Sequence, residues 1–138
     1  MADELALKKV KNTDLRFLYE LLAEREPKTF ISHKSMPTWE EHVNFVRSKP
    51  YAKWYIIELG KKNVGMILLT FQNEIGIFIK KGIQHKGLGT RALKMLIGEN
   101  TNLRYLANVS PKNKESERFF KKNGFKLIQY TYEITDSK

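Results

Sequence analysis

Gln84-His85-Lys86-Gly87-Leu88-Gly89-Thr90 joins a segment with the alternation of a strand to a segment with the spacing of a helix. Its glycines lack a Cβ atom, so successive backbone N–H groups can approach an anion closely. The start of the helix adds unpaired donors and a partial positive charge. Lys86, Arg91 and Lys94 strengthen that field. The stretch is typical of a turn that binds phosphate.

Two familiar phosphate-binding motifs do not fit this turn. A Walker loop ends in Gly-Lys-Ser/Thr, whereas Gly89 is followed by Thr90-Arg91. A dinucleotide-binding fingerprint requires three glycines in the pattern G-x-G-x-x-G, and here only Gly87 and Gly89 are present. A turn with a purely structural role therefore remains an alternative.

The segments around the turn predict alternating strands and helices. Before it, residues 74–80 place Ile75, Ile77 and Ile79 on one face of a strand. After it, we expect a helix over 88–100, a strand over 105–110, a helix over 113–122 ending at Asn123-Gly124, and a last strand or strand pair over 125–134.

The N-terminal half shows the same alternation. A strand over 5–10 precedes a helix that Thr13 can cap, residues 25–37 form a loop, and Thr38 and Glu41 match a capping box that starts a second helix. Strands over 53–59 and 64–72 flank a turn at 60–63. Without repeats or linkers, residues 1–138 are expected to form a single α/β domain, a three-layer sandwich.

Composition limits the classes of function. The formal net charge of +10 suits an anionic partner such as a phosphate-rich cofactor or nucleic acid. The lysines are scattered and no RNA-binding motif is present, so nucleic acid is not the expected partner. The absence of cysteine excludes thiolate catalysis and disulfides. With no signal-peptide pattern and no apolar run long enough for a membrane span, we expect a cytoplasmic protein without membrane contact.

Combined in this order, the pieces resemble the GNAT superfamily of acetyl-CoA-dependent N-acetyltransferases. Residues 84–89 match its pattern Q/R-x-x-G-x-G/A after a strand, and a second strand carrying Asn108 follows. The short helix at Asn113-x-x-Ser116 then runs into Gly124-Phe125. The resemblance extends over almost the whole chain, and it implies a GNAT-like three-layer α/β/α sandwich around a mixed, mostly antiparallel sheet.

The resemblance also implies acetyl-CoA as co-substrate and gives roles to particular residues. Backbone amides over His85–Thr90 would hold the pyrophosphate. The strand ending at Phe78-Ile79 would diverge from the strand at Ala107-Asn108, leaving main-chain groups for pantetheine, and an amide near Phe78 would polarise the thioester carbonyl. Asn113 would contact the cofactor or cap its helix. The implied cofactor-binding set is Phe78, Ile79, Gln84, His85, Lys86, Gly87, Leu88, Gly89, Thr90, Asn108, Asn113 and Phe120, with Lys112, Lys114 or Arg118 meeting the 3′-phosphate.

One position departs from the family pattern. Many members place a tyrosine four residues before the glycine of Gly-Phe, as the general acid for the departing thiolate, and here that residue is Phe120. Phenylalanine cannot donate a proton, so water or another group would have to do so. A non-catalytic acyl-CoA binder therefore stays open as an alternative. The basic composition separately leaves open an RNA-binding protein on the same scaffold.

The expected acceptor is a primary amine on a protein N-terminus, an amino sugar or a small molecule. Because function concentrates in irregular loops, we expect the acceptor to contact Glu26 and His33 of the segment Glu24–Pro37, and Tyr132 of the last strand.

No residue can be assigned as the general base. Glu74 lies near the right strand but alternates to the face opposite Ile75 and Ile77, and His33 and His42 are candidates by residue type only. The histidines show no metal-ligand spacing, so no metal is expected. The sequence fits either a monomer or a homodimer.

Overall fold

A computed structural model describes residues 4–25, 36–83, 87–99 and 104–136 of the chain. Within these ranges no helix is both long and apolar enough to cross a bilayer. The elements in chain order are β1 (Leu5–Lys9), the 3₁₀ turn η1 (Asn12–Asp14), α1 (Leu15–Glu24), α2 (Trp39–Arg47), β2 (Lys53–Leu59), β3 (Lys62–Leu69), β4 (Ile75–Ile79), α3 (Leu88–Glu99) and α4 (Lys114–Lys122).

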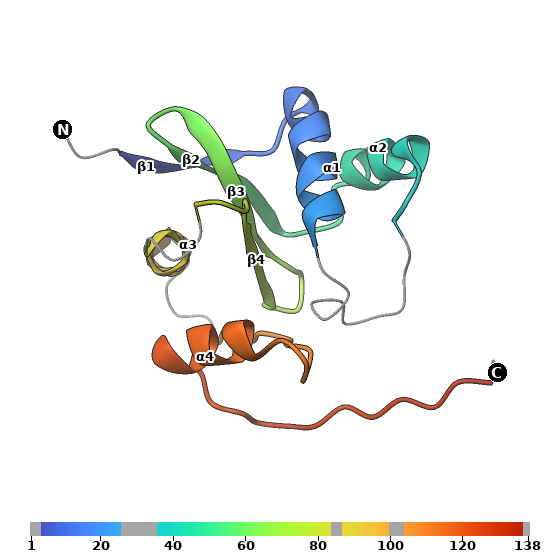
Figure 1. Ribbon diagram of the computed structural model, residues 1–138, viewed down its shortest axis with the longest axis vertical. Helices are drawn as coiled ribbons and strands as arrows, with labels where there is room; N and C mark the ends of the chain where they lie inside the picture. Colours follow the sequence, from blue (N-terminus) through green and yellow to red (C-terminus); the bar gives the residue numbers. More distant parts are fainter. Residues whose placement is uncertain (1–3, 26–35, 84–86, 100–103, 137–138) are drawn as a thin grey trace.

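The four strands form one sheet in the order β1-β2-β3-β4, and every neighbouring pair is antiparallel (Figure 1). The hairpin between β2 and β3 turns on Gly60 and Lys61, with φ of 57° and 70°. Positive φ at both positions is what a two-residue turn needs to match the twist of its strands. The predicted strands at 53–59 and 64–72 are thus confirmed as a hairpin, with the second strand ending at Leu69.

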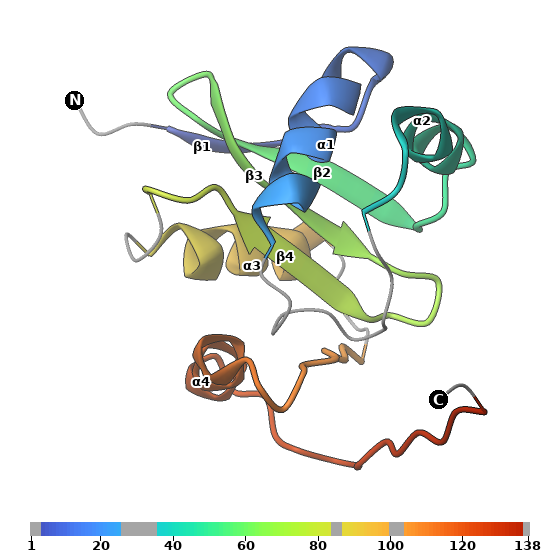
Figure 2. The ribbon, with the colours of Figure 1, turned by 45° about the vertical axis from the view of Figure 1, so that its right-hand side comes forward.

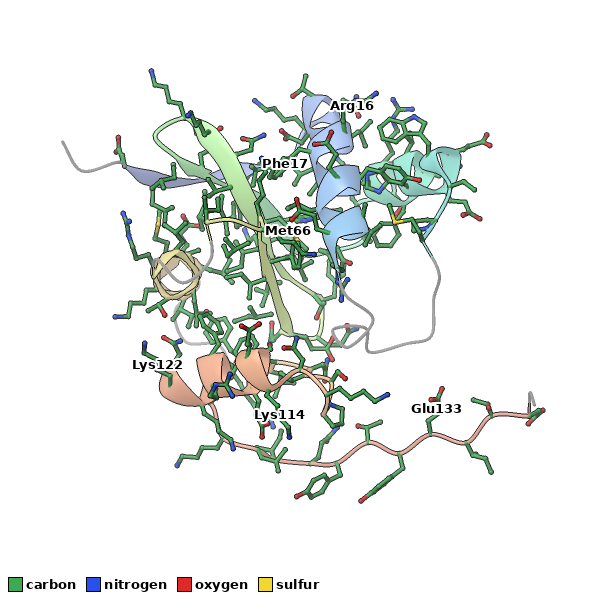
Figure 3. All side chains as sticks on the ribbon, viewed as in Figure 1. Arg16, Phe17, Met66, Lys114, Lys122 and Glu133 are labelled. Atoms are coloured by element: carbon green, nitrogen blue, oxygen red, sulfur yellow. The ribbon has the colours of Figure 1, made fainter. Side chains whose placement is uncertain are left out.

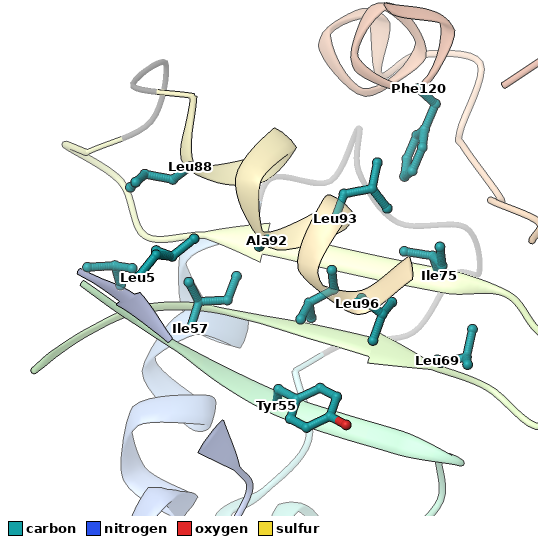
Figure 4. Packing of buried hydrophobic residues seen from close by; sticks show 12 residues of the cluster. Leu5, Tyr55, Ile57, Leu69, Ile75, Leu88, Ala92, Leu93, Leu96 and Phe120 are labelled. Carbon is teal, nitrogen blue, oxygen red and sulfur yellow. The ribbon is translucent and has the colours of Figure 1, made fainter. Parts of the chain in front are cut away.

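Helices cover both faces of the sheet (Figures 1 and 2). On one face, Ile56 of β2 is buried with Leu15 and Leu18 of α1 and Val46 of α2. On the other, residues from the strands pack against Ala92, Leu93 and Leu96 of α3 and Phe120 of α4 (Figure 4). Successive residues of a strand point to opposite faces, so one strand can supply both layers. The predicted three-layer sandwich is confirmed.

The prediction of a strand over 105–110 is wrong, because only one of these residues forms a β-bridge. Leu106 forms a single parallel bridge with Glu74 at the start of β4. Beyond it the segment keeps an extended alternation, since Tyr105, Ala107 and Val109 all pack against the core on the α3 side. The bridge is parallel, but it lies outside the four-stranded sheet, whose strand pairs are all antiparallel.

The predicted last strand over 125–134 is also wrong within the described residues. The segment contains no paired strand, and Tyr130 and Tyr132 are 74% and 88% exposed. Figures 1 and 3 show it running below α4 as an extended arm that carries Glu133. An alternating apolar sequence becomes a strand only where another strand offers hydrogen bonds, and among the described residues none pairs with it.

The two N-caps that the sequence predicts in the N-terminal half differ in outcome. Thr13 does not cap α1; the helix starts after Asp14, whose Oδ2 accepts a 2.8 Å hydrogen bond from the Lys11 N–H. The capping box at α2 is confirmed, because Thr38 Oγ1 accepts from the Glu41 N–H at 3.1 Å and Glu41 Oε1 accepts from the Thr38 N–H at 2.9 Å.

Candidate functional site

The described part of the glycine turn leads directly into α3. Gly87 has φ of +74°, a left-handed conformation that favours glycine, and its carbonyl accepts the first helical hydrogen bond, from the Arg91 N–H at 3.1 Å. The N–H groups of Leu88, Gly89 and Thr90 therefore precede the intrahelical ladder and have no acceptor within α3. Such a helix start fits a phosphate group.

The space in front of Gly87 is open, since a Cβ atom built there meets no atom within 4 Å. A hollow of about 620 Å³ lies between residues 61–64 of the β2–β3 hairpin and residues 80–83 after β4, and its lining includes Lys61, Lys62, Lys80 and Lys81. These lysines give the hollow a positive lining, and two of them, Lys80 and Lys81, precede the turn in the chain. The other predicted residues of the turn, Gln84, His85 and Lys86, lie outside the described residues.

Gly89 has a packing role in addition to any contact with phosphate. A Cβ atom at Gly89 would lie 3.0 Å from Cε1 of Phe119 on α4. Next to it, the Asn123 side chain donates a 3.3 Å hydrogen bond to Oγ1 of Thr90. The end of α4 therefore docks on the first turn of α3, so the structural alternative for this glycine has direct support.

The main chain of β4 has one edge that β3 does not cover. The Ile75 N–H points away from β3, because it donates to the Leu106 carbonyl at 2.7 Å, while the Lys80 N–H donates to Val64 of β3 at 2.8 Å. Since these directions alternate along an antiparallel strand, the main-chain groups of Ile77 face the edge where residues 107–110 leave β4. Phe78 itself is paired with Met66 of β3.

Glu74 and Asn108 meet where the two segments separate. The Asn108 side-chain amide donates to Glu74 Oε2 at 2.9 Å, and the Thr70 hydroxyl donates to Glu74 Oε1 at 3.1 Å. Both carboxylate oxygens thus accept hydrogen bonds, so Glu74 links the β3–β4 turn to the segment at Asn108.

The predicted residues of α4 have structural partners. Asn113 caps the helix, because its Oδ1 accepts a 3.1 Å hydrogen bond from the Ser116 N–H. This explains the Asn-x-x-Ser spacing without a ligand. Phe120 is only 6% exposed and points from α4 toward Leu93 and Ile75 (Figure 4). The Lys112, Lys114 and Arg118 side chains are exposed.

A small cavity of about 100 Å³ lies on the opposite face of the sheet, under α1 and α2. Its floor includes Trp54, Met66 and Phe78 from three adjacent strands, where Met66 and Phe78 are direct register partners. Figure 3 shows Met66 beside α1. Leu18 of α1 and Phe45 of α2 contribute to the walls. Phe78 thus borders this cavity with its side chain, next to Ile77, whose main chain faces the open edge of β4.

The aromatic wall of the cavity is held by ring contacts. Tyr51 and Trp54 pack edge-to-face with centroids 4.8 Å apart, and Phe45 meets Tyr51 in the same way at 5.8 Å. The Trp54 indole N–H donates to Met66 Sδ at 3.2 Å. These contacts fix the shape of the wall.

Arg25 brings the only formal charge among the described residues that line this cavity. Burial lowers the pKa of Arg25, and the nearby Tyr51 acts in the opposite direction. Burial likewise raises the pKa of the Tyr51 phenol. Both groups keep their usual forms near neutral pH, a cationic guanidinium and a neutral phenol.

Of the three acceptor residues predicted from sequence, the structure describes only Tyr132. Glu26 and His33 lie outside the described residues, and Tyr132 lies on the exposed arm and does not line the cavity. Glu24 holds the turn after β4, since its Oε1 accepts from the Lys81 N–H at 2.9 Å. His42 is 4% exposed and its Nε2 lies 2.9 Å from the Leu15 carbonyl, which supports a structural role.

Sequence reasoning missed the cavity, because its lining comes from separate strands and helices with no shared motif. Among the residues that the structure describes, no three His, Asp or Glu side chains gather as possible metal ligands.

A sequence model of the acetyltransferase (GNAT) domain family matches residues 4–126. The chain belongs to the GNAT acetyltransferase family. A comparison with curated protein sequences finds no match. Among solved structures, this GNAT domain is similar to a domain from Methanocaldococcus jannaschii, with a TM-score of 0.81 and 24% identity over 95% of this chain and 94% of that one.

Two further GNAT-like structures carry names that state an activity. One is RimL, a ribosomal L7/L12 α-N-protein acetyltransferase in complex with coenzyme A, with a TM-score of 0.71 and 17% identity over 91% of this chain and 81% of that one. The other is the spermidine N-acetyltransferase SpeG of Vibrio cholerae, with a TM-score of 0.70 and 20% identity over 91% and 81%. At these identities the likeness shows the fold of this GNAT domain, and the acceptor has to be argued from its own residues.

Proposed function

We propose that this GNAT domain transfers an acetyl group from acetyl-CoA to a primary amine, with both substrates bound at once. The observation that carries the proposal is the arrangement around β4. Its main-chain edge at Ile77, which β3 does not cover, lies between the start of α3, which suits a pyrophosphate, and the side chain of Phe78, which borders the cavity.

The residues present fit the cofactor. The start of α3 offers the N–H groups of Leu88, Gly89 and Thr90, and the open space at Gly87 lets a phosphate approach. Lys80 and Lys81, which line the hollow and follow β4, add positive charge after this strand that favours an anion. Asn108 and Asn113 border the segment that leaves β4, where a pantetheine arm would run.

Acetyl-CoA supplies an activated acetyl group, and the residues of the chain hold the two substrates in place for the transfer. Transfer forms a C–N bond as the C–S bond breaks, the amine loses a proton and the thiolate gains one. The Ile77 N–H faces the open edge and is the main-chain donor suited to a carbonyl oxygen there. This refines the sequence-based expectation, which placed that amide near Phe78.

Proton transfer does not depend on Phe120 in this scheme. Phe120 has no proton to give and lies in the core, so the proton lost by the amine would reach the thiolate through solvent. The base also stays unassigned, because Glu74 already accepts two hydrogen bonds and His42 is held by Leu15.

The test is a mass-spectrometric screen for coenzyme A release and acetylated product across amines of different classes, run beside a thermal-shift titration with acetyl-CoA. If the protein is an enzyme, acetyl-CoA should stabilise it against heat and an acetylated amine should form. A ligand at about 100 times its Kd stabilises a folded protein by about 2.7 kcal/mol, which is well above detection. Stabilisation without product from any amine would identify a non-catalytic binder, and the absence of both would overturn the proposal.

A further inference from the structure

The cavity under α1 and α2 is lined by side chains from both helices and from three strands of the sheet. It adjoins Phe78, and Phe78 follows the residue whose main chain faces the open edge of β4. A group held in the cavity therefore has its attachment point beside the place where acetyl transfer is proposed. Whatever occupies the cavity would select the acceptor.

The lining of the cavity is apolar. Eight of the ten residues that border it are aliphatic or aromatic, and the other two are Arg25 and His42. His42 is occupied by the Leu15 carbonyl. Burying apolar surface contributes about 25 cal/mol per Å², so a hydrocarbon side chain gains more here than a hydroxylated one. Sugar hydroxyls would lose water without finding enough partners.

The charge of the cavity opposes a polycation. Among the described residues that line it there is no Asp or Glu, and the one charged group is the Arg25 guanidinium. A second ammonium group on the acceptor would be moved out of water into this apolar lining, where none of the described lining residues offers it a carboxylate. The lost hydration disfavours binding.

The size of the cavity also favours a small acceptor group. At about 100 Å³ it is far smaller than the roughly 300–1,000 Å³ of pockets that enclose drug-sized ligands. It can take one side chain but not a multi-ring aminoglycoside.

We infer that the acceptor is a primary amine whose neighbouring group is a single apolar side chain, with no second positive charge, and that Trp54, Phe78 and Arg25 make this selection. The inference rests on the proposed function and narrows it to small apolar amines and N-terminal residues with apolar side chains.

The first test needs only the wild-type protein. Leucinamide and phenethylamine are compared with spermidine and kanamycin by kcat/KM for coenzyme A release at saturating acetyl-CoA. We expect the two apolar amines to be preferred by at least about tenfold, since pocket contacts of one or a few methylenes are worth that much. Equal or greater activity with spermidine or kanamycin would overturn the inference while leaving acetyl transfer established. Absence of turnover with all four amines, with acetyl-CoA still stabilising the protein, would also overturn it.

The second test reverses the charge in the cavity. Arg25→Glu should shift the ratio of kcat/KM for spermidine over leucinamide upward by about tenfold or more, because the ammonium groups then meet a carboxylate instead of a guanidinium. Arg16→Glu is the matched control, since Arg16 lies on α1 over the Trp39 ring and does not line the cavity. An unchanged ratio in a folded Arg25→Glu protein, or an equal shift in both variants, would contradict a role for the cavity. Should Arg25→Glu not fold, the wild-type comparison decides the question alone.

Discussion

The side-chain amide of Asn108 donates a 2.9 Å hydrogen bond to Oε2 of Glu74, across the point where residues 107–110 leave β4. Together with the single bridge at Leu106, this bond sets where the open edge of β4 begins. The groove proposed for acetyl-CoA therefore depends on a side-chain contact between two polar residues at its narrow end.

Asn108→Asp should loosen this end of the groove. It places a carboxylate against Glu74, so a hydrogen bond is replaced by repulsion, and we expect a loss of about 1 kcal/mol in unfolding free energy and weaker binding of acetyl-CoA. Thermal melts with and without acetyl-CoA measure both effects. Adding Glu74→Gln restores a donor and should recover most of the loss; failure of the double variant to recover would assign the effect to something other than this pair.

Gly87→Asp should abolish acetyl-CoA binding while the fold stays intact. Asp tolerates a positive φ and caps helices well, and the position has room for a Cβ atom, but its carboxylate would repel a phosphate at the start of α3. Gly87→Asn is the matched control with the same shape and no charge, and it should retain most of the affinity. Thermal shift with acetyl-CoA separates the two, and equal affinity in both variants would contradict a phosphate site at this turn.

Gly89→Ala should destabilise the protein in the absence of any ligand. Its Cβ would lie 3.0 Å from Cε1 of Phe119, and overpacking of this kind typically costs about 1–3 kcal/mol. A larger substitution such as Gly89→Glu would disturb the same contact, so it is not a clean probe of phosphate binding. Phe119→Leu should rescue Gly89→Ala in a double-mutant cycle of chemical denaturation; purely additive losses would show that the contact is not the cause.

Phe120→Tyr should lower the melting temperature without raising kcat. The ring is 6% exposed among apolar side chains, so a hydroxyl added there loses water, at a cost of about 1–3 kcal/mol when it finds no partner. Melting curves and steady-state kinetics measure the two effects. Higher turnover at unchanged stability would instead place the edge of this ring at the departing sulfur.

Gly65→Ala should be far more damaging than Gly98→Ala. A Cβ at Gly65 would collide with the Phe78 carbonyl oxygen and lie 3.1 Å from the Ile79 Cα, which pushes β4 away from β3. Gly98 lies near the end of α3 with nothing within 4 Å of a built Cβ, so alanine there should stabilise the helix by about 0.5–1 kcal/mol. Urea denaturation of both variants gives the comparison, and similar stabilities would show that β4 can move freely at Phe78.

The parts of the site that sequence predicted well are those with a local cause. Gly87 requires no distant partner to adopt φ of +74°, and the N–H groups of the next residues are unpaired in any helix that starts there. The capping box of Thr38 and Glu41 is likewise complete within four residues. Such features are determined by the residues themselves, so a sequence pattern suffices.

The strand predictions for 105–110 and 125–134 failed for the opposite reason. Alternation records which side of an extended chain is apolar, and it was correct for Tyr105, Ala107 and Val109, which all face the core. Whether such a segment becomes a strand depends on hydrogen bonds from another segment, and these are not encoded in its own alternation.

By itself, then, the sequence determined the layer architecture, the family and the glycine turn that is proposed to bind phosphate, because periodicity, caps and glycine geometry act over a few residues. Only the tertiary structure decided that the main chain of Ile77 faces the open edge, that Phe120 packs inward, and that Trp54, Phe78 and Arg25 border one small cavity. The physical reason is that strand register and the packing of helices on a sheet bring together residues far apart in the chain, and no local pattern specifies which of them will meet.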